Sequence, residues 1–158
     1  GVIGSDFADN ITGNGRDNFL YGRGGNDIIA GNAGRDWLFG GTGADSLTGG
    51  DDEDLLMAGG LAANALDIDD LFDIMKEWSS TDTEDHYEER IDTLSGILLW
   101  YTRDRENGNS LLDDSTLVGD SDADTLAGSG DTDWFFYDAG EDTLSDLDAD
   151  LEETVDIG

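Results

Sequence analysis

The chain has 158 residues, which suits a single domain, and 39 acidic side chains against 7 Lys and Arg give it a formal net charge of −32. This charge argues against nucleic acid or an anionic membrane surface as a partner, because phosphate binding needs clustered Lys and Arg. The absence of Cys excludes disulfides and thiolate metal sites, and no apolar run approaches the roughly 20 residues of a membrane-spanning helix.

Residues 1–57 form a nine-residue repeat. Glycine opens each unit, at Gly4, Gly13, Gly22, Gly31, Gly40 and Gly49. The sixth position is Asp or Asn, at Asp9, Asn18, Asp27, Asp36, Asp45 and Asp54. The eighth position is apolar, at Ile11, Leu20, Ile29, Leu38, Leu47 and Leu56. Six consecutive units in phase predict a repeat architecture.

Residues 58–118 interrupt this phase and predict a helical insert. DIDDLFDIMKEWSS, residues 67–80, places apolar side chains on one helical face, with Asp67 or Asp69 as the cap, at Leu71, Ile74, Met75 and Trp78. A second helix, weakened by Gly96, is predicted from the spacing of Tyr87, Ile91, Leu94, Leu98 and Tyr101. We expect both helices to pack on the repeat array through Trp78 and Trp100.

The phase returns in residues 119–158. Units that begin at 119, 128 and 137 place Asp124, Asp133 and Asp142 at the sixth position and Leu126, Phe135 and Leu144 at the eighth. The tail DLDADLEETVDIG is expected to cap an exposed sheet end. The sequence therefore predicts one repeat array with an insert. Because it begins inside a repeat, we expect it to belong to a longer parent chain.

Each unit is predicted to contain a turn over its first six positions and a strand over its last three. Glycine tolerates positive φ and close backbone approach, so it can bend the turn until carbonyl oxygens point inward. The apolar eighth residue should face the interior and its two neighbours the outside. Two units complete one coil, so stacked turns lie two units apart in the sequence and bring aspartates together in pairs. Calcium takes roughly 6–8 oxygen ligands in flexible geometry, and it suits such turns better than magnesium does.

GGTGADSLT, residues 40–48, matches without a departure the calcium-binding nonapeptide G-G-x-G-x-D-x-U-x, in which U is a large apolar residue. GRGGNDIIA and GNAGRDWLF match it with one or two glycines replaced. On these motifs the chain resembles the RTX (repeats-in-toxin) family. The resemblance implies a mainly β fold, a parallel β-roll with an α-helical insertion and a C-terminal cap. It also implies several bound Ca²⁺ ions and a secreted or cell-surface location reached by type I secretion.

In that family, an earlier turn supplies the carbonyls of its second and fourth positions and its Asp. The turn two units later supplies the carbonyls of its first and third positions and its Asp. Carried onto this chain, the implied metal ligands lie in the turns and are Ser5, Phe7, Asp9, Gly22, Arg23, Gly24, Gly25, Asp27, Gly31, Asn32, Ala33, Gly34, Asp36, Gly40, Gly41, Thr42, Gly43, Asp45, Gly49, Gly50, Asp51, Asp52, Asp54, Gly119, Ser121, Asp124, Gly128, Gly130, Asp133 and Asp142.

One step departs from the family pattern. Asn14, Arg16 and Asn18 would form a weaker or empty site, because Asn18 replaces the Asp and Arg16 replaces a glycine. If the roll resumes in phase after the insert, the aspartate pairs of the later sites are Asp45 with Asp124, Asp54 with Asp133, and Asp124 with Asp142.

Other interpretations of single motifs stay open. The acids could form a solvated array, and DSDADTLAGSGD, residues 120–131, has EF-hand-like spacing, although Thr125 and Asp131 replace the Gly and Glu of that loop. His86 has no visible catalytic partner, so we expect no enzyme activity. An aromatic ligand-binding patch, or more simply core, could be built from Trp37, Trp134, Phe135 and Phe136.

The predicted function is a calcium-binding module of a larger secreted bacterial protein that folds on binding calcium outside the cell. Two alternatives remain. One is the C-terminal secretion and folding tail of a secreted hydrolase. The other is a ligand- or adhesin-type binding module that acts through the helical insert, which is similar to inserts within some large bacterial RTX and adhesin-like proteins.

Overall fold

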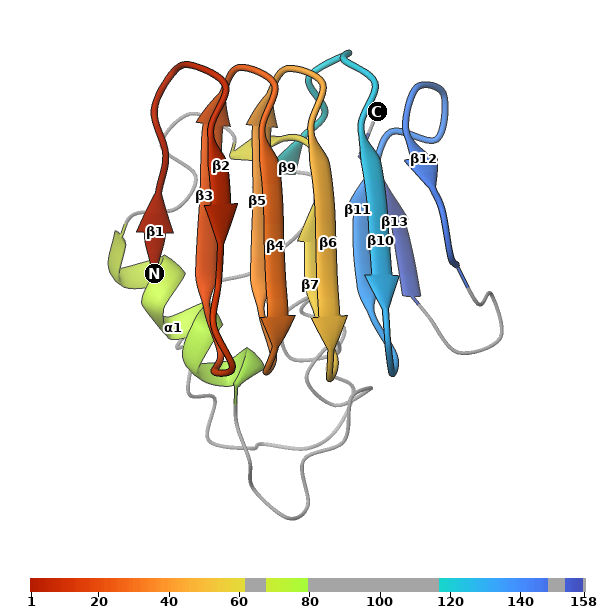
Figure 1. The fold of residues 1–158 in the computed structure, drawn as a ribbon. Helices are drawn as coiled ribbons and strands as arrows, with labels where there is room; N and C mark the ends of the chain where they lie inside the picture. Colours follow the sequence, from red (N-terminus) through yellow and green to blue (C-terminus); the bar gives the residue numbers. More distant parts are fainter. Residues whose placement is uncertain (62–67, 80–116, 148–152, 158) are drawn as a thin grey trace. The chain divides into compact units, whose positions relative to one another are not determined.

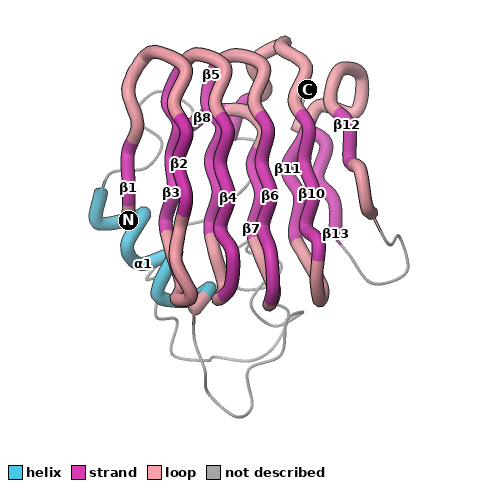
Figure 2. Tube along the Cα trace, viewed as in Figure 1, coloured by secondary structure: helices cyan, strands magenta, loops and turns pink. Residues whose placement is uncertain are grey.

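The computed structural model describes residues 1–61, 68–79, 117–147 and 153–157. The chain divides into two compact units, one made of Gly1–Gly60 with Val118–Gly158 and the other of Leu61–Leu117. The first unit contains the nine-residue repeats and consists of strands joined by turns, as Figure 1 and Figure 2 show.

The strands of the repeats alternate between two parallel sheets, so each coil adds one strand to each sheet (Figure 1). The first sheet has the order β1, β3, β5, β7, β11 and β13, with bounds Val2–Ile3, Phe19–Gly24, Trp37–Thr42, Leu55–Met57, Trp134–Tyr137 and Glu153–Asp156. The second has the order β12, β10, β6, β4 and β2, with bounds Thr143–Leu144, Thr125–Ser129, Ser46–Asp51, Ile28–Ala33 and Asn10–Thr12. This mainly β solenoid is the parallel β-roll that the family resemblance implied.

The register of the sheets is set by the repeat. Leu20 lies beside Leu38, and Ile29 lies beside Leu47, an offset of 18 residues. Across the insert, Leu47 lies beside Leu126, and the offset becomes 79 residues. The difference between the two offsets equals the length of the segment 58–118. The roll therefore resumes on the register that it left.

A separate two-stranded sheet stands where the chain leaves and rejoins the roll. It pairs β8, Gly60–Leu61, with β9, Leu117–Val118. This pairing brings the two ends of the intervening segment together. A long excursion is tolerable under these conditions, because closure entropy grows only slowly with loop length.

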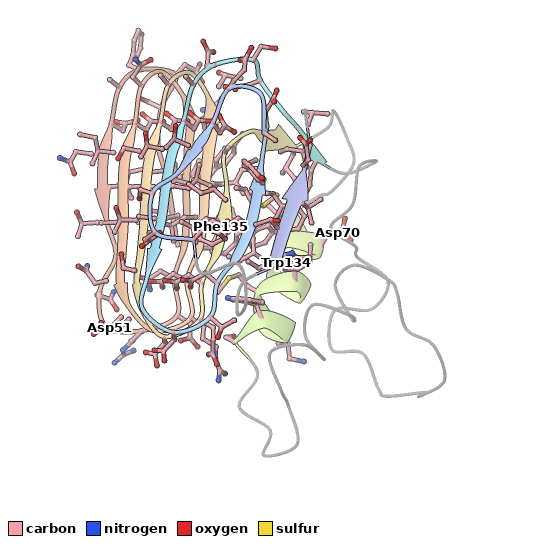
Figure 3. All side chains as sticks on the ribbon, turned by 90° about the vertical axis from the view of Figure 1, so that its right-hand side faces the viewer. Asp51, Asp70, Trp134 and Phe135 are labelled. Atoms are coloured by element: carbon pink, nitrogen blue, oxygen red, sulfur yellow. The ribbon has the colours of Figure 1, made fainter. Side chains whose placement is uncertain are left out.

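The core of the roll consists of two rows of apolar side chains, one from each sheet, which form one cluster. It contains the eighth residues of the units and Ala58, namely Ile11, Leu20, Ile29, Leu38, Leu47, Leu56, Ala58, Leu126 and Phe135, with Leu144 partly buried beside them. Figure 3 shows Phe135 directed between the sheets, whereas Trp134 points to the opposite side of β11. The prediction that the eighth residue faces the interior is therefore confirmed.

In the first sheet, most residues that flank a core residue are buried, although the repeat predicts that they face outward. Trp37, Phe39 and Leu55 are fully buried there, as are Trp134 and Phe136 to within 1%. The ring of Trp37 packs edge-on against Phe19 at 5.2 Å between centroids. Burial also argues against the aromatic ligand-binding patch, since Trp37, Trp134, Phe135 and Phe136 are all buried.

The second sheet keeps the predicted alternation. Its flanking residues are exposed on β2 and β6, at Asn10, Thr12, Ser46 and Thr48. The two sheets thus have the same inner face and different outer faces. The nine-residue pattern describes the inner face that both sheets share. The two outer faces are distinguished only when units two apart, which belong to the same sheet, are compared.

The strands are longer than the three positions predicted from the repeat. β3, β4, β5 and β6 each have six residues, because the first residues of the following turn also pair with the stacked turn. Arg23 pairs with Gly41 and Asn32 pairs with Gly50 in this way. The stretch with EF-hand-like spacing is part of the roll, since Thr125–Ser129 is β10.

The tail adds a strand to the roll. Within it, Glu153–Asp156 forms β13, and Val155 lies beside Phe136 of β11. The predicted capping role of the tail is in keeping with this position at the end of the first sheet.

In the second unit, the structure describes the helix α1, Ile68–Trp78. The predicted apolar face is present, with Ile74 and Trp78 buried. The second predicted helix, Trp100 and His86 lie outside the described residues. Within the described part of the chain, no helix has the length and apolar character needed to cross a membrane.

Candidate calcium sites in the stacked turns

The predicted metal ligands lie in two columns of stacked turns, which connect the strands of one sheet to those of the other. One column holds the turns 4–9, 22–27, 40–45 and 120–124, followed by the turn that contains Asp142. The other holds the turns 13–18, 31–36, 49–54 and 128–133. The structure therefore brings together residues that the sequence separates by 18 or 79 positions.

The second and fourth positions of the turns 22–27, 31–36, 40–45, 49–54 and 128–133 adopt a left-handed backbone. The φ angles are 82° at Arg23 and 95° at Gly25, and 116° at Gly41 and 113° at Gly43. Glycine adopts such angles without strain, which accounts for its place in the repeat. The stacked turns approach so closely that a Cβ on Gly41 would meet the carbonyl of Arg23, and one on Gly43 would meet the carbonyl of Gly25. These carbonyls therefore face the next turn.

One carboxylate oxygen of each sixth-position Asp builds a hydrogen-bond ladder along the column. The amide of Asp9 donates to Oδ1 of Asp27 at 2.7 Å, and the amide of Asp27 donates to Oδ1 of Asp45 at 2.7 Å. The ladder crosses the insert, because the amide of Asp45 donates to Oδ1 of Asp124 at 2.6 Å. The second column has the same arrangement, from Asn18 through Asp36 and Asp54 to Asp133.

The other carboxylate oxygen is buried and has no hydrogen-bond partner at five interior positions, the Oδ2 atoms of Asp27, Asp36, Asp45, Asp54 and Asp124. These residues are at most 3% exposed. A buried carboxylate oxygen without a donor is costly unless a cation or a proton compensates it.

For Asp27, Asp36, Asp45 and Asp54, the opening glycine of the unit makes room for that oxygen. A Cβ on Gly22 would fall on Oδ2 of Asp27 and close to the carbonyl oxygen of Gly40. A Cβ on Gly31 would likewise meet Oδ2 of Asp36 and the carbonyl oxygen of Gly49. The first glycine and the sixth Asp thus form a small cradle in which a carboxylate and a carbonyl of the next turn converge.

At the insert, the cradle uses a residue that the sequence analysis missed. A Cβ on Gly40 would meet Oδ2 of Asp45 and the carbonyl oxygen of Ala58. The sequence analysis had assigned this carbonyl to Gly119, whose amide instead donates to the carbonyl of Ile157 at 3.2 Å. The chain therefore leaves the roll after Ala58, which fills the first position of the interrupted unit.

Burial makes the interior carboxylates hard to ionise in the absence of a cation. It raises the pKa of Asp36 and of Asp45 to about 7, the pKa of Asp124 to about 8 and the pKa of Asp54 to about 9. Hydrogen bonds from the ladder amides act in the opposite direction, and neighbouring aspartates add repulsion. The charged form thus needs positive charge beside it.

The ends of the columns are different, since their side chains are satisfied locally. Oδ2 of Asp9 accepts from the amide and hydroxyl of Ser5 at 2.6 and 2.8 Å, and these bonds hold the pKa of Asp9 below its usual value. Oδ1 of Asn18 accepts from the amide of Asn14, and Oδ2 of Asp142 accepts from the amide of Asp138. Among these turns, the unpartnered oxygens therefore belong to the interior of the stack.

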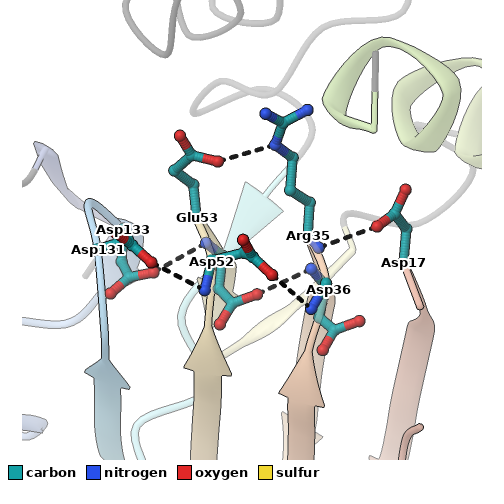
Figure 4. Close-up of polar contacts among 9 residues, drawn as sticks. Asp17, Arg35, Asp36, Asp52, Glu53, Asp131 and Asp133 are labelled. Carbon is teal, nitrogen blue, oxygen red and sulfur yellow. Dashed lines mark hydrogen bonds and ion pairs between the residues drawn. The ribbon is translucent and has the colours of Figure 1, made fainter. Parts of the chain in front are cut away.

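An outer set of contacts, which the sequence analysis also missed, joins the turns of the second column (Figure 4). Arg35 donates from its amide to Oδ1 of Asp17 at 3.0 Å and from Nε to Oε2 of Glu53 at 2.8 Å. The amide of Asp52 donates to Oδ2 of Asp131 at 3.1 Å. A comparison of units two apart would have found Asp17, Arg35 and Glu53, because all three occupy the fifth position of their units.

The donor set fits a hard cation. It consists of carboxylate and carbonyl oxygens, and no Cys exists in the chain. No three His, Asp or Glu side chains of the described residues converge as a metal cluster. Carbonyl oxygens must therefore complete any coordination shell, which suits calcium, with its flexible geometry, better than magnesium.

A family model agrees with this arrangement. The RTX calcium-binding nonapeptide repeat matches the chain in four copies, over residues 3–38, 31–61 and 112–144. The matched ranges lie on both sides of the insert and together cover more than half of the chain. No curated protein and no solved structure matches the chain.

Proposed function

We propose that this chain, which belongs to the RTX calcium-binding nonapeptide repeat family, binds several calcium ions between its stacked turns and folds as it does so. The observation that carries the proposal is the row of buried, unpartnered Oδ2 atoms in the interior turns. Those of Asp27, Asp36, Asp45 and Asp54 lie beside the opening glycine of their unit, and above Gly22, Gly31 and Gly40 the oxygen converges with a carbonyl of the next turn. A cation at this place would compensate the charge that burial otherwise disfavours.

The residues of a cradle have separate tasks. In the first column, Oδ2 of Asp27 and the carbonyl of Gly40 would hold the ion, while Oδ1 of Asp27 keeps the ladder bond with Asp9. The carbonyls of Arg23 and Gly25 face the same interturn space and complete the proposed ligand set. Calcium itself would supply the positive charge that lets two acidic turns stack. Because it binds only the folded stack, it stabilises that state by mass action.

This chemistry suits a structural module of a larger secreted protein. Calcium sites of extracellular modules typically have dissociation constants of about 10⁻⁴–10⁻³ M, so such a roll would fold where calcium is abundant. The β-roll is a structural calcium-binding fold, and we assign no catalytic role to it. Secretion by the type I route is supported by the family resemblance.

The test is circular dichroism of the chain in chelator and in rising calcium. We expect little β-structure in chelator, a cooperative gain of β-signal with calcium, and a much weaker gain at equal magnesium. Isothermal calorimetry on the same samples should show several ions bound for each chain. Identical spectra with chelator and with millimolar calcium would refute the proposal.

A further inference from the structure

Two ion pairs among the described residues join one turn of the roll to the next turn of the stack. Arg23 pairs with Asp6 at 3.1 Å and connects the turns 22–27 and 4–9. Arg35 pairs with Glu53 at 2.8 Å and connects the turns 31–36 and 49–54 (Figure 4). Each guanidinium therefore links neighbouring turns, as the proposed calcium ions would.

Arg35 is the better-placed of the two arginines. Its side chain and that of Glu53 are 24% and 27% exposed, against 48% and 75% for Arg23 and Asp6. Its amide also donates to Asp17 of the preceding turn. Through these two contacts Arg35 connects three consecutive turns, 13–18, 31–36 and 49–54. The first of these turns contains Asn18, where the ligand set for calcium is poorest.

The charge of the roll is distributed unevenly along its axis. Residues 1–39 contain five acids and three arginines, Arg16, Arg23 and Arg35. Residues 40–57 and 119–158 contain nineteen acids and no Lys or Arg. In the first two coils, arginines of the chain itself can therefore neutralise most of the acidic charge. The later coils contain no Lys or Arg that could do so. Like charges that are brought together by stacking repel one another, so the later coils depend more on an outside cation.

We propose that the arginines of the first two coils act as resident cations, with Arg35 as the principal one, and so set the order in which the roll closes. The first coils close at low calcium and provide an edge on which the later coils assemble at higher calcium. This inference rests on the proposed calcium-driven folding and specifies how it is regulated along the roll.

The experiment is hydrogen exchange of the full chain at stepped free calcium, read separately for peptides of β3 and β4 and of β10 and β11. We expect the amides of β3 and β4 to gain protection at a lower calcium concentration than those of β10 and β11. If calcium protects no strand, the proposed function fails. If all four strands gain protection at one concentration, calcium-driven folding stands and the ordered closure is overturned.

Variants of the Arg35 pair provide the second test. Arg35→Gln is expected to raise the calcium midpoint of β3 and β4 about two- to fivefold, the range of a partly exposed ion pair. Arg35→Lys should recover part of this loss. The matched control is Arg16→Gln, which removes the same charge from the adjacent turn and should shift the midpoint less.

A double-mutant cycle separates the pair from net charge. If Arg35 acts through Glu53, then Arg35→Gln should have little further effect in a Glu53→Gln background. Equal shifts from Arg16→Gln and Arg35→Gln, or full additivity with Glu53→Gln, would overturn the assignment to Arg35.

Discussion

At the scale of residues, the opening glycine and the sixth-position Asp of a unit act as one device. The opening glycine is needed for space. At Gly22 the missing Cβ is where Oδ2 of Asp27 and the carbonyl of Gly40 meet. Left-handed φ angles belong to other turn positions, such as Gly25 and Gly43. The repeat thus uses glycine for two different physical reasons.

This distinction predicts the effect of a single methyl group. Gly22→Ala should weaken calcium-driven folding by about 1–3 kcal/mol, the usual cost of overpacking, because the Cβ occupies the cradle. Gly15→Ala is the matched control, since a Cβ at Gly15 meets nothing within 4 Å. Calcium titrations followed by circular dichroism measure both variants. Equal midpoints for Gly22→Ala and Gly15→Ala would contradict the cradle.

The interior aspartates should matter more than the turn that departs from the family pattern. Asp45→Asn keeps an oxygen for the ladder bond from Asp27 and removes the charge of a buried carboxylate. We expect it to raise the calcium midpoint about tenfold, which corresponds to ~1.4 kcal/mol. Asn18→Ala should have a smaller effect, because Asn18 is bound locally to Asn14. A larger shift for Asn18→Ala, in the same titration, would show that the assigned ligands are wrong.

At the scale of elements, the spacing of glycine, Asp and the apolar residue was enough to predict the two-unit coil and the core. Leu20, Leu38 and Leu56 lie side by side in the first sheet for this reason. The outer faces were not predicted, because the nine-residue pattern averages two sheets with different surroundings. Trp37 and Phe39 flank one core residue, whereas Ser46 and Thr48 flank the next. The difference between the two outer faces is visible in the sequence only when units two apart are compared.

The use of Ala58 in place of Gly119 was also beyond the sequence pattern. Both residues can complete an in-phase unit, since ADSDADTLA and GDSDADTLA differ only in the first position. The choice depends on where the chain leaves the roll, and that is fixed by pairing of β7 with β5 and β11. Spacing within one sequence cannot distinguish the two.

The continuous register predicts the outcome of removing the insert. Deletion of residues 59–119 joins Ala58 to Asp120 and restores an uninterrupted unit, so the variant should still gain β-structure with calcium. Deletion of 59–118 leaves one residue more and should not fold to the same extent, because a slip of one residue turns core side chains to the opposite face. Circular dichroism and hydrogen exchange of the strands β6 and β10 compare the two deletions. Equal folding of both would contradict a continuous register.

The role of the insert is tested by the same deletion. The sequence analysis predicted that its helices cover a face of the roll, and this stays a prediction. This prediction can be measured on the outer face of the first sheet, where eight flanking residues of β3, β5, β7 and β11 are apolar. If the prediction holds, the in-phase deletion should fold with calcium and bind a hydrophobic dye more strongly than the full chain.

At the scale of the whole molecule, the formal charge of −32 and the buried aspartates act in the same direction. Both oppose closure of the roll at neutral pH unless cations are supplied, and protons can replace calcium in this respect. The sites and the overall charge therefore couple folding to pH as well as to calcium.

This coupling has a definite sign. The folded pKa values of Asp36, Asp45, Asp124 and Asp54, at about 7 to 9, lie above the ordinary value of 3.8. Groups of this kind bind more protons in the folded state, so their contribution to stability is complete below the ordinary pKa. It is lost as the pH rises through the folded pKa values. In chelator, the chain should therefore be better folded at pH 5.5 than at pH 8.

The same protons must leave when calcium binds. We therefore expect calcium to release protons near pH 7 and its midpoint to rise as the pH is lowered from 8 to 6. Circular dichroism in chelator across pH 5.5–8 and proton release measured in weakly buffered calcium titrations provide the two readouts. The Asp45→Asn variant is the control, because it should release fewer protons for each chain. A calcium-free β-signal that grows toward pH 8, or calcium binding without proton release, would contradict the burial of these carboxylates.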